Sequence, residues 1–255
     1  MGGQTIEQSS YDEIADWYNE SMQDGSLLAY LELFLPHLFA LMGDVPGLRI
    51  CDLACGQGYL SRKLAERGAQ VVGIDLSANM LAYARVAEEY EPSGIIYIQD
   101  DARTLDTQVD ASFDGVLCNL ALMDIPDLYA TFQSIYRILR HQGWFVFSIL
   151  HPCYLTSYTG WIGETDGRLS RKVRGYFEEG FRLPDNPSKV RSKVGAYYRT
   201  LSTYLNTLLD TGFTLERLIE PQAPPDVDPR FRGYREIPSA LMVRGRKMAS
   251  YRCTS

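Results

Sequence analysis

Residues 50–58 constrain this chain of 255 residues more than any other segment. They read Ile-Cys-Asp-Leu-Ala-Cys-Gly-Gln-Gly, a pattern typical of a buried strand that runs into a glycine turn and then a helix. Glycines at 56 and 58 let the backbone approach a ligand where a side chain would block it. Residues 70–74 form a second apolar strand, and Asp75 after them can accept hydrogen bonds from ribose hydroxyls. The pattern therefore predicts a nucleoside site.

Two other nucleotide-binding patterns do not fit this turn. The dinucleotide fingerprint needs a third glycine three residues after the second, and Ser61 or Tyr59 stands there, depending on where the count starts. A P-loop would end in Gly-Lys-Ser or Gly-Lys-Thr, and this turn does not. A nicotinamide oxidoreductase is therefore a disfavoured alternative.

The turn instead resembles the first motif of the class I S-adenosylmethionine-dependent methyltransferases, a hydrophobic strand followed by Asp-x-Gly-x-Gly-x-Gly. Ala54 stands where many members of that family have the first glycine. Four later segments resemble family motifs in the same order and at the expected spacing, and they are residues 75–81, 99–102, 113–122 and 139–144. An ordered set of five signals is much more specific than one glycine turn.

The resemblance implies that the cofactor is S-adenosyl-L-methionine, with S-adenosyl-L-homocysteine as the product. It implies that Asp75 holds the ribose, that Met80 lies against the adenine and that Asp101 bonds the adenine amino group. It also suggests that Tyr11 reaches the methionine carboxylate. The full set of cofactor-binding residues that we predict is Tyr11, Ala54, Cys55, Gly56, Gly58, Asp75, Leu76, Met80, Asp101, Ala102, Asn119 and Leu120.

The order of the predicted elements indicates an α/β fold in four parts. Residues 1–47 form a helical N-terminal cap, and residues 48–150 form the cofactor-binding core, where strands alternate with helices as in a parallel sheet covered on both faces. Residues 151–199 form a lid or substrate insertion after the fifth strand, because so long a connection is usually functional. Residues 200–255 add a helix and the last two strands of the same domain. The resemblance implies a Rossmann-like, seven-stranded, mostly parallel sheet with an antiparallel last strand.

Charge argues against a nucleic-acid partner. The net charge is −7, whereas enzymes that act on nucleic acids normally carry a basic face. Residues 119–122 also lack the Asp/Asn-Pro-Pro-Tyr/Phe motif of methyltransferases that act on exocyclic base amines. Basic residues gather locally in residues 168–193, and a solvated lid face, a grip on an anionic substrate and an RNA contact stay open as explanations, in that order.

Neither a membrane nor a metal ion is expected. The most apolar stretch, residues 27–42, is interrupted by Glu32, Pro36 and His37, and the first residues lack the pattern of a secretion signal. The five cysteines are an odd number without metal-ligand spacing, which favours reduced core residues. We therefore predict a cytoplasmic location, and a homodimer stays among the alternatives for the oligomeric state.

His151 is the predicted catalytic base. It directly follows the fifth strand, whose carboxyl end borders the ligand crevice in sheets of this type, and Pro152 restricts its backbone. A neutral imidazole can take a proton from a hydroxyl at pH 7. A structural histidine at the strand end is the alternative. The predicted substrate residues are mostly aromatic, as suits a flat organic acceptor, and they are Tyr18, Tyr154, Tyr158, Trp161, Tyr198 and Arg199.

These observations together predict a small-molecule methyltransferase. Its acceptor is expected to be a hydroxyl on an aromatic or heterocyclic metabolite. N-methylation of a ring or amine nitrogen is the alternative within the enzyme class. A non-catalytic subunit that binds the cofactor and serves a partner is the alternative outside it.

Overall fold

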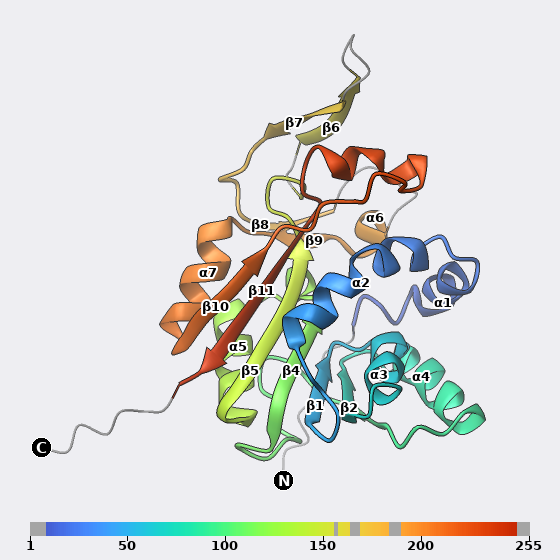
Figure 1. Cartoon of the computed structure of the whole chain (residues 1–255), viewed down its shortest axis with the longest axis vertical. Helices are drawn as coiled ribbons and strands as arrows, with labels where there is room; N and C mark the ends of the chain where they lie inside the picture. Colours follow the sequence, from blue (N-terminus) through green and yellow to red (C-terminus); the bar gives the residue numbers. More distant parts are fainter. Residues whose placement is uncertain (1–8, 156–157, 164–168, 184–189, 249–255) are drawn as a thin grey trace, which may run out of the picture.

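A seven-stranded sheet forms the centre of the molecule, in the order β10-β11-β5-β4-β1-β2-β3 (Figure 1). The computed structural model describes residues 9–155, 158–163, 169–183 and 190–248. The first five strands pair in parallel, and β11 runs antiparallel between β5 and β10. The expected fold class is confirmed. The strands are β1 (Arg49–Leu53), β2 (Gln70–Asp75), β3 (Ile96–Gln99), β4 (Phe113–Asn119), β5 (Leu139–Leu150), β10 (Phe213–Ile219) and β11 (Ala240–Lys247).

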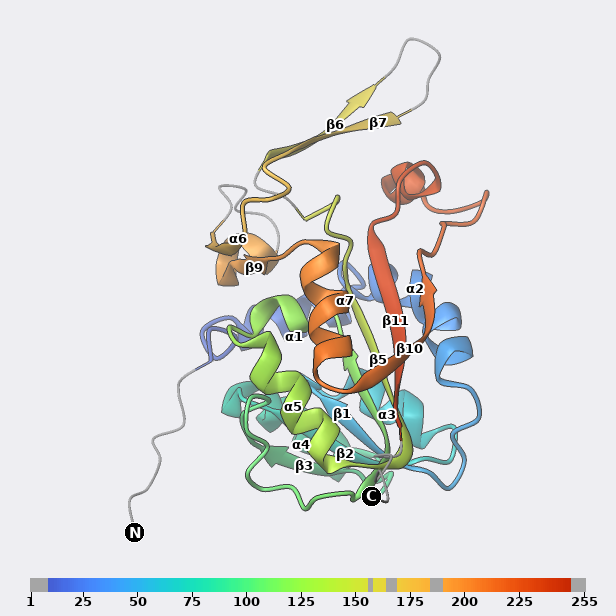
Figure 2. The same cartoon turned by 90° about the vertical axis from the view of Figure 1, so that its left-hand side faces the viewer.

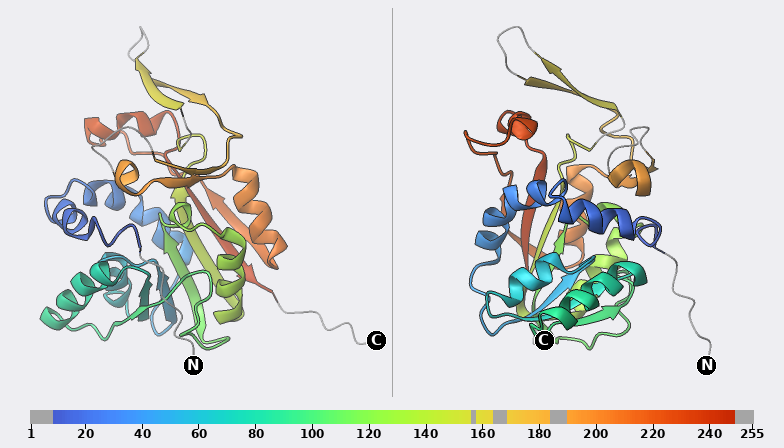
Figure 3. Two further views of the ribbon diagram at one scale, coloured as in Figure 1. Left: turned by 180° about the vertical axis from the view of Figure 1, so that it is seen from behind. Right: turned by 90° about the vertical axis from the view of Figure 1, so that its right-hand side faces the viewer.

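Helices cover both faces of the sheet (Figures 2 and 3). Within the described residues, no single helix is long and apolar enough to cross a membrane; α1 and α2 pass that test only as a pair, which is bent by 76°. The α-helices are α1 (Ala15–Gln23), α2 (Leu28–Met42), α3 (Tyr59–Ala65), α4 (Ala78–Tyr90), α5 (Leu128–Ile138), α6 (Val190–Val194) and α7 (Leu201–Asp210).

Two hydrophobic cores form because successive residues of a strand point to opposite faces. In β1, Ile50 joins the core under α2, α3 and α4, while its neighbour Cys51 joins the core under α5 and α7. Phe145 and Val146 of β5 divide between the two cores in the same way. The central strands are therefore apolar on both faces, as expected for a parallel sheet between two helical layers.

Among the described residues, three α-helices begin at a side-chain cap, which satisfies backbone N–H groups that the first turn leaves free. Ser77 accepts a hydrogen bond from the Met80 N–H at the start of α4. Asp127 caps α5 and Thr200 caps α7 in the same manner. The cap at Ser77 also fixes the chain immediately after Asp75, at the end of β2.

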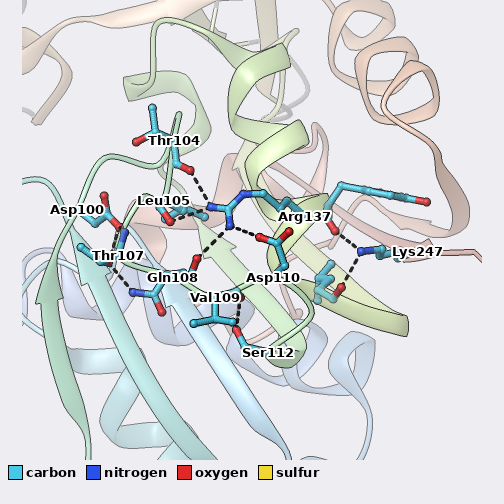
Figure 4. Close-up of polar contacts among 12 residues, drawn as sticks. Asp100, Thr104, Leu105, Thr107, Gln108, Val109, Asp110, Ser112, Arg137 and Lys247 are labelled. Carbon is cyan, nitrogen blue, oxygen red and sulfur yellow. Dashed lines mark hydrogen bonds and ion pairs between the residues drawn. The ribbon is translucent and has the colours of Figure 1, made fainter.

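Arg137 of α5 fixes the loop that connects β3 to β4 (Figure 4). Its guanidinium donates to the carbonyl oxygens of Thr104, Leu105 and Gln108 at 2.8–3.0 Å, and it also pairs with Asp110. Three carbonyls and a carboxylate around one arginine leave the loop little freedom to change its path.

The remaining elements gather above the carboxyl end of β5 (Figure 1). Two short antiparallel pairs follow β5, and the first of them, β6 with β7, projects beyond the rest of the molecule (Figure 2). These elements are η1 (Leu122–Asp124), β6 (Tyr158–Gly163), β7 (Leu169–Arg174), β8 (Gly180–Arg182), β9 (Ala196–Tyr198) and η2 (Pro229–Arg235).

We expect Gly115→Ala to destabilise the fold. Gly115 of β4 lies opposite Trp144 of β5, and a Cβ at Gly115 would lie 2.2 Å from Cζ2 of that rigid indole. Overpacking of this kind typically lowers the free energy of unfolding by about 1–3 kcal/mol, which urea unfolding followed by circular dichroism would measure. Gly163→Ala is the matched control, since no described atom lies within 4 Å of its added Cβ. Equal stability of the two variants would contradict the packing argument.

Candidate functional site

A cavity of about 1290 Å³ opens at the carboxyl end of the sheet, between the N-terminal helices and the elements that follow β5. The ends of β1, β2 and β4 supply one side of it, through residues 54–57, Asp75 and residues 119–121. This is the position at which ligands bind in open α/β sheets. Eight of the predicted cofactor-binding residues line the cavity, and they are Tyr11, Ala54, Cys55, Gly56, Asp75, Met80, Asn119 and Leu120.

Two backbone N–H groups orient the carboxylate of Asp75. Oδ2 accepts from the Gly56 N–H at 2.7 Å, and Oδ1 accepts from the Ser77 N–H at 2.8 Å. Each carboxylate oxygen can accept more than one hydrogen bond, so both keep capacity for the hydroxyls of a bound ribose. A Cβ at Gly56 would lie 3.0 Å from Cε of Met80. With φ of 56° at this position, any other residue would strain the backbone and crowd Met80, so the turn favours glycine, and these residues fit the expected cofactor.

Two non-glycine residues at the edge of the cavity adopt left-handed backbone conformations. Ala54 has φ of 55° and Leu120 has φ of 53°. Such values cost energy for residues with a Cβ, and they tend to occur at functional sites. Ser148 supports the strained turn at Leu120, because its carbonyl and hydroxyl oxygens accept from the Leu120 N–H at 2.9 and 3.0 Å. The left-handed conformation also explains why a glycine suits position 54 in related turns.

Burial perturbs the two carboxyl groups that line this end of the cavity. It raises the pKa of Asp75 to about 6 and the pKa of Asp52 to about 7, although hydrogen bonds partly oppose the increase. Ser61 donates one of those bonds, from Oγ to Asp52 Oδ2, at 2.6 Å. Ser61 stands where the dinucleotide fingerprint would need its third glycine. Here its hydroxyl provides a hydrogen-bond partner for the buried carboxyl of Asp52.

A largely buried polar cluster, whose two charged side chains are each 16% exposed, joins three distant segments over the cavity. Asp124 of η1 forms an ion pair with Arg191 of α6, whose Nη2 lies 3.1 Å from both Asp124 Oδ2 and the Tyr11 hydroxyl. Tyr11 in turn donates to Asp124 at 3.2 Å. Burial alone would lower the pKa of Arg191, but Asp124 and Tyr11 raise it. Burial raises the pKa of Asp124, and Arg191 opposes that increase. The pair ties the N-terminal segment and α6 to the end of β4.

Tyr18 lies beside this cluster and lines the cavity, as predicted for a substrate residue. Its ring meets the Tyr11 ring edge to face at 6.0 Å. Burial raises the pKa of Tyr18 to about 12, so its hydroxyl is protonated at neutral pH. Tyr154 and Tyr198, two more predicted substrate residues, also line the cavity.

Four predicted cofactor residues do not line the cavity in the structure: Gly58, Leu76, Asp101 and Ala102. Gly58 begins α3, and a Cβ there would lie 2.3 Å from the Tyr97 hydroxyl oxygen, so this glycine serves helix packing. Asp101 is engaged by its neighbour, because the Arg103 side chain binds its carboxylate at 2.6 Å. Burial alone would raise the pKa of Asp101, but the bonds from Arg103 lower it. The adenine contact of Asp101 stays a prediction.

His151, the predicted base, does not line the cavity either. Its side chain is only 9% exposed, and Nε2 lies 2.8 Å from Glu220 Oε1, within ion-pair distance although not aligned as a hydrogen bond. Nδ1 accepts from the Cys153 N–H at 3.1 Å and contacts the Cys153 sulfur at 2.8 Å. Burial lowers the pKa of His151, although Glu220 opposes the decrease. Both ring nitrogens therefore face protein groups, and the geometry favours the structural alternative.

Two predicted substrate residues, Arg199 and Trp161, do not line the cavity. Arg199 donates to the carbonyl oxygens of Leu122, Ile125 and Pro126 at 2.6–2.9 Å, so it fixes the loop that carries Asp124. Trp161 is 37% exposed, and its ring lies 6.5 Å from that of Tyr154 and 6.3 Å from that of Tyr234. The side chain of Tyr158 lies outside the described part of the chain.

Sequence reasoning missed several residues that line the cavity. Asp124 gave no motif signal, and Arg191 was noticed only as part of a basic segment. Tyr30 of α2 and two rings of η2, Phe231 and Tyr234, also line the cavity. The two η2 rings stack with centroids 5.7 Å apart. Their place in a proline-rich connection hid them, because only the tertiary fold brings η2 over the end of β5.

We expect Arg191→Met to loosen the cover of the cavity. The substitution keeps most of the side-chain volume but leaves Asp124 buried without its cation, which typically lowers the free energy of unfolding by about 3–5 kcal/mol. Limited proteolysis should then cut the segment around Tyr11 faster. The double variant Asp124→Asn with Arg191→Met is the control, and it should recover part of the stability. Unchanged proteolysis in the single variant would contradict this role.

Comparison with known proteins agrees with the geometry. A family profile described as "Methyltransferase domain" matches residues 51–147. A solved S-adenosylmethionine-dependent methyltransferase from Mesorhizobium loti is 34% identical, superposes with a TM-score of 0.75, and is matched over 84% of this chain and 97% of its own.

Two curated relatives match over shorter stretches. The ubiquinone biosynthesis O-methyltransferase of Leptothrix cholodnii is 29% identical over 57% of this chain, and that of Nitrosomonas europaea is 30% identical over 53% of it. The chain spans 63% and 57% of the length of these two relatives. Profile, identity, coverage and fold agree, and the chain belongs to the class I S-adenosylmethionine-dependent methyltransferases.

Proposed function

We propose that this protein transfers a methyl group from S-adenosylmethionine to a hydroxyl on a small aromatic or heterocyclic molecule. One observation carries the proposal, namely that a single cavity holds both the Gly56–Asp75 cradle and a group of aromatic side chains. The cradle suits the nucleoside part of the cofactor, and the aromatic side chains suit a flat acceptor.

The aromatic group comes from three parts of the chain. Tyr154 follows β5, Tyr30 belongs to α2, and Phe231 and Tyr234 belong to η2. The hydroxyls of Tyr154 and Tyr234 lie 3.2 Å apart, so these two polar tips meet at the edge of the aromatic group. Rigid rings with polar tips bind planar organic molecules at low entropic cost. The two curated relatives named as O-methyltransferases support a hydroxyl acceptor.

Positioning is the main contribution that we assign to this chain. The cofactor, when bound, supplies an electrophilic methyl group. The chain must then align the acceptor oxygen with that methyl and exclude water, and such orientation can lower a barrier by roughly 7–11 kcal/mol. The ion pair of Asp124 with Arg191 holds part of the cover in place over the cavity. An acceptor hydroxyl that is already acidic would need no strong base.

N-methylation stays the second candidate, because His151, the predicted base for a hydroxyl acceptor, does not line the cavity. A neutral amine needs no proton removed before attack, so proximity alone would suffice. A non-catalytic subunit that binds the cofactor is the third candidate. The cytoplasmic location, the absence of nucleic-acid and membrane partners, and the homodimer remain predictions from the sequence.

The proposal is tested by offering the protein a metabolite extract with S-adenosylmethionine that carries an isotope-labelled methyl group. Mass spectrometry should find a labelled small molecule, and the carbon chemical shift of the methyl separates an O-methyl from an N-methyl product. A labelled amine would move the function to N-methylation. Tight cofactor binding without any labelled product would favour the non-catalytic subunit.

We expect the affinity for S-adenosylhomocysteine to fall as the pH decreases through about 6. The ribose hydroxyls bond best to ionised Asp75, whose pKa is about 6 without ligand, so protonation competes with binding. Asp75→Ala should weaken binding by about 1.5–3 kcal/mol. It should also remove the pH step that calorimetry detects in the wild type. An equal pH dependence in a folded Asp75→Ala variant would show that another group is responsible.

We expect His151→Gln to change stability more than activity. Loss of the contacts with Cys153 and Glu220 should lower the free energy of unfolding by about 0.5–1.5 kcal/mol, because the Cys153 N–H loses its acceptor while the 48%-exposed Glu220 keeps access to water. The rate of methyl transfer and its pH profile should stay close to wild type. A rate loss of about 10²-fold together with loss of an ionisation would instead restore the base role. Cys153→Ala is the matched control for the packing effect.

A further inference from the structure

An excess of positive charge lines the cavity away from the nucleoside cradle. Five cationic residues of the segment after β5 line it: Arg171, Lys172, Arg174, Arg182 and Arg191. Asp124 neutralises Arg191, and the other two acids that line the cavity, Asp52 and Asp75, belong to the ends of β1 and β2. Since the whole chain carries a net charge of −7, this local excess is not a general property of the surface.

Arg171 is the most unusual of these cations. It lies on β7 opposite Trp161 of β6, and its Cζ lies 3.7 Å from the centre of the Tyr154 ring and 5.1 Å from that of Trp161. Nη2 donates to the Tyr154 carbonyl oxygen at 2.8 Å. Nε is buried and has no hydrogen-bond partner in the described part of the chain. No described carboxylate lies within ion-pair distance of this guanidinium.

Stacking on the Tyr154 ring and the bond to the Tyr154 carbonyl oxygen stabilise this partly buried guanidinium, but among the described residues they leave Nε without a hydrogen-bond partner and the charge without a carboxylate. Burial lowers the pKa of Arg171, although the nearby tyrosines oppose the decrease, and an arginine in a protein still keeps its proton. A desolvated cation with free N–H groups is suited to a carboxylate or phosphate, which can accept two parallel bonds from it. Arg182 on β8 differs, because its Nη2 lies 3.2 Å from Glu178 Oε2 in an ion pair, although its Nε has no described partner.

The cofactor does not account for this charge. Arg171 lies among the side chains Tyr154, Trp161 and Tyr234, and the cradle of Gly56 and Asp75 belongs to the ends of β1 and β2. The β6–β7 pair lies well away from β2 in two perpendicular views (Figures 1 and 2). The guanidinium thus belongs to the part of the cavity that an acceptor would fill.

We infer that the methyl acceptor is an anion, a planar ring that carries a carboxylate or phosphate group held by Arg171. The ring lies among Tyr154, Phe231 and Tyr234, and the anionic group fixes which ring atom faces the cofactor. This inference rests on the proposed function and names the substrate class within it. It also explains how a site without a histidine in its cavity can select and orient its acceptor.

A binding experiment on the whole protein saturated with S-adenosylhomocysteine tests this assignment. The probes are naphthalene-2-carboxylate and 2-naphthyl phosphate, each compared with the neutral naphthalene-2-carboxamide of similar shape. We expect at least one of the two anions to bind at least about tenfold more tightly than the amide. A preference for the carboxylate or for the phosphate then identifies the anionic group.

Variants connect that preference to Arg171. Arg171→Met keeps the apolar stem and should bring anion and amide to within about threefold of each other, while Arg171→Lys should keep part of the preference. Arg140→Met removes a charge at the start of β5, outside the cavity, and should change nothing. If Arg171→Met fails to fold, Arg171→Gln, which removes the charge but keeps a polar tip, takes its place with the same expected loss of preference.

Two results would overturn the assignment. One is equal binding of anions and amide to the wild type, and the other is no binding of either anion at about 10 mM, since a matched cationic pocket should reach millimolar affinity. Calorimetry with S-adenosylhomocysteine alone shows whether a negative result overturns only the anionic acceptor or the proposed methyl transfer as well. Cofactor binding without anion preference overturns only the substrate class, whereas loss of cofactor binding removes the proposed function itself.

Discussion

The central strands are buried on both faces, and this constraint decides where polar chemistry can be placed. Ile50 and Cys51 are fully buried in different cores, so β1 has no face on which a ligand could lie. Functional groups can then come only from the strand ends and from the loops above them. The carboxylate of Asp75, held by two backbone N–H groups, and the left-handed turn at Leu120 are such groups. The sheet supplies their rigidity.

The cover over these strand ends depends on pairings between residues far apart in the chain. Arg191 contacts Tyr11 across 180 residues and Asp124 across 67. A buried ion pair of this kind contributes little net stability, but removing one partner is costly because it leaves a charge without water. It therefore specifies one arrangement of the cover more than it strengthens the fold. Arg199 acts on the same loop through three carbonyl oxygens.

The fold and the cofactor cradle could be predicted from sequence because their signals are local. Gly56 and Asp75 lie in a strand, turn and helix pattern that hydrophobic periodicity exposes. The surroundings of His151 were not predictable in this way, since they include Glu220 after β10, which comes close only when β10 has paired with β11 and β11 with β5. Gly58 shows the same difficulty, because the Tyr97 hydroxyl that excludes a side chain there belongs to β3. Tertiary contacts therefore determine both the surroundings of His151 and the need for glycine at position 58.

The two ends of the cavity differ in charge, and this difference follows from how each end is built. At the cradle, Asp52 and Asp75 lie on the sheet, where burial raises their pKa values and backbone or hydroxyl donors satisfy them. At the other end, Arg171 stacks on an aromatic ring with no carboxylate beside it among the described residues. The fold satisfies its buried acids internally but leaves the Nε of a partly buried cation without a partner among the described residues. A ligand with a negative group would complete the hydrogen bonds of that guanidinium, as we infer for the acceptor.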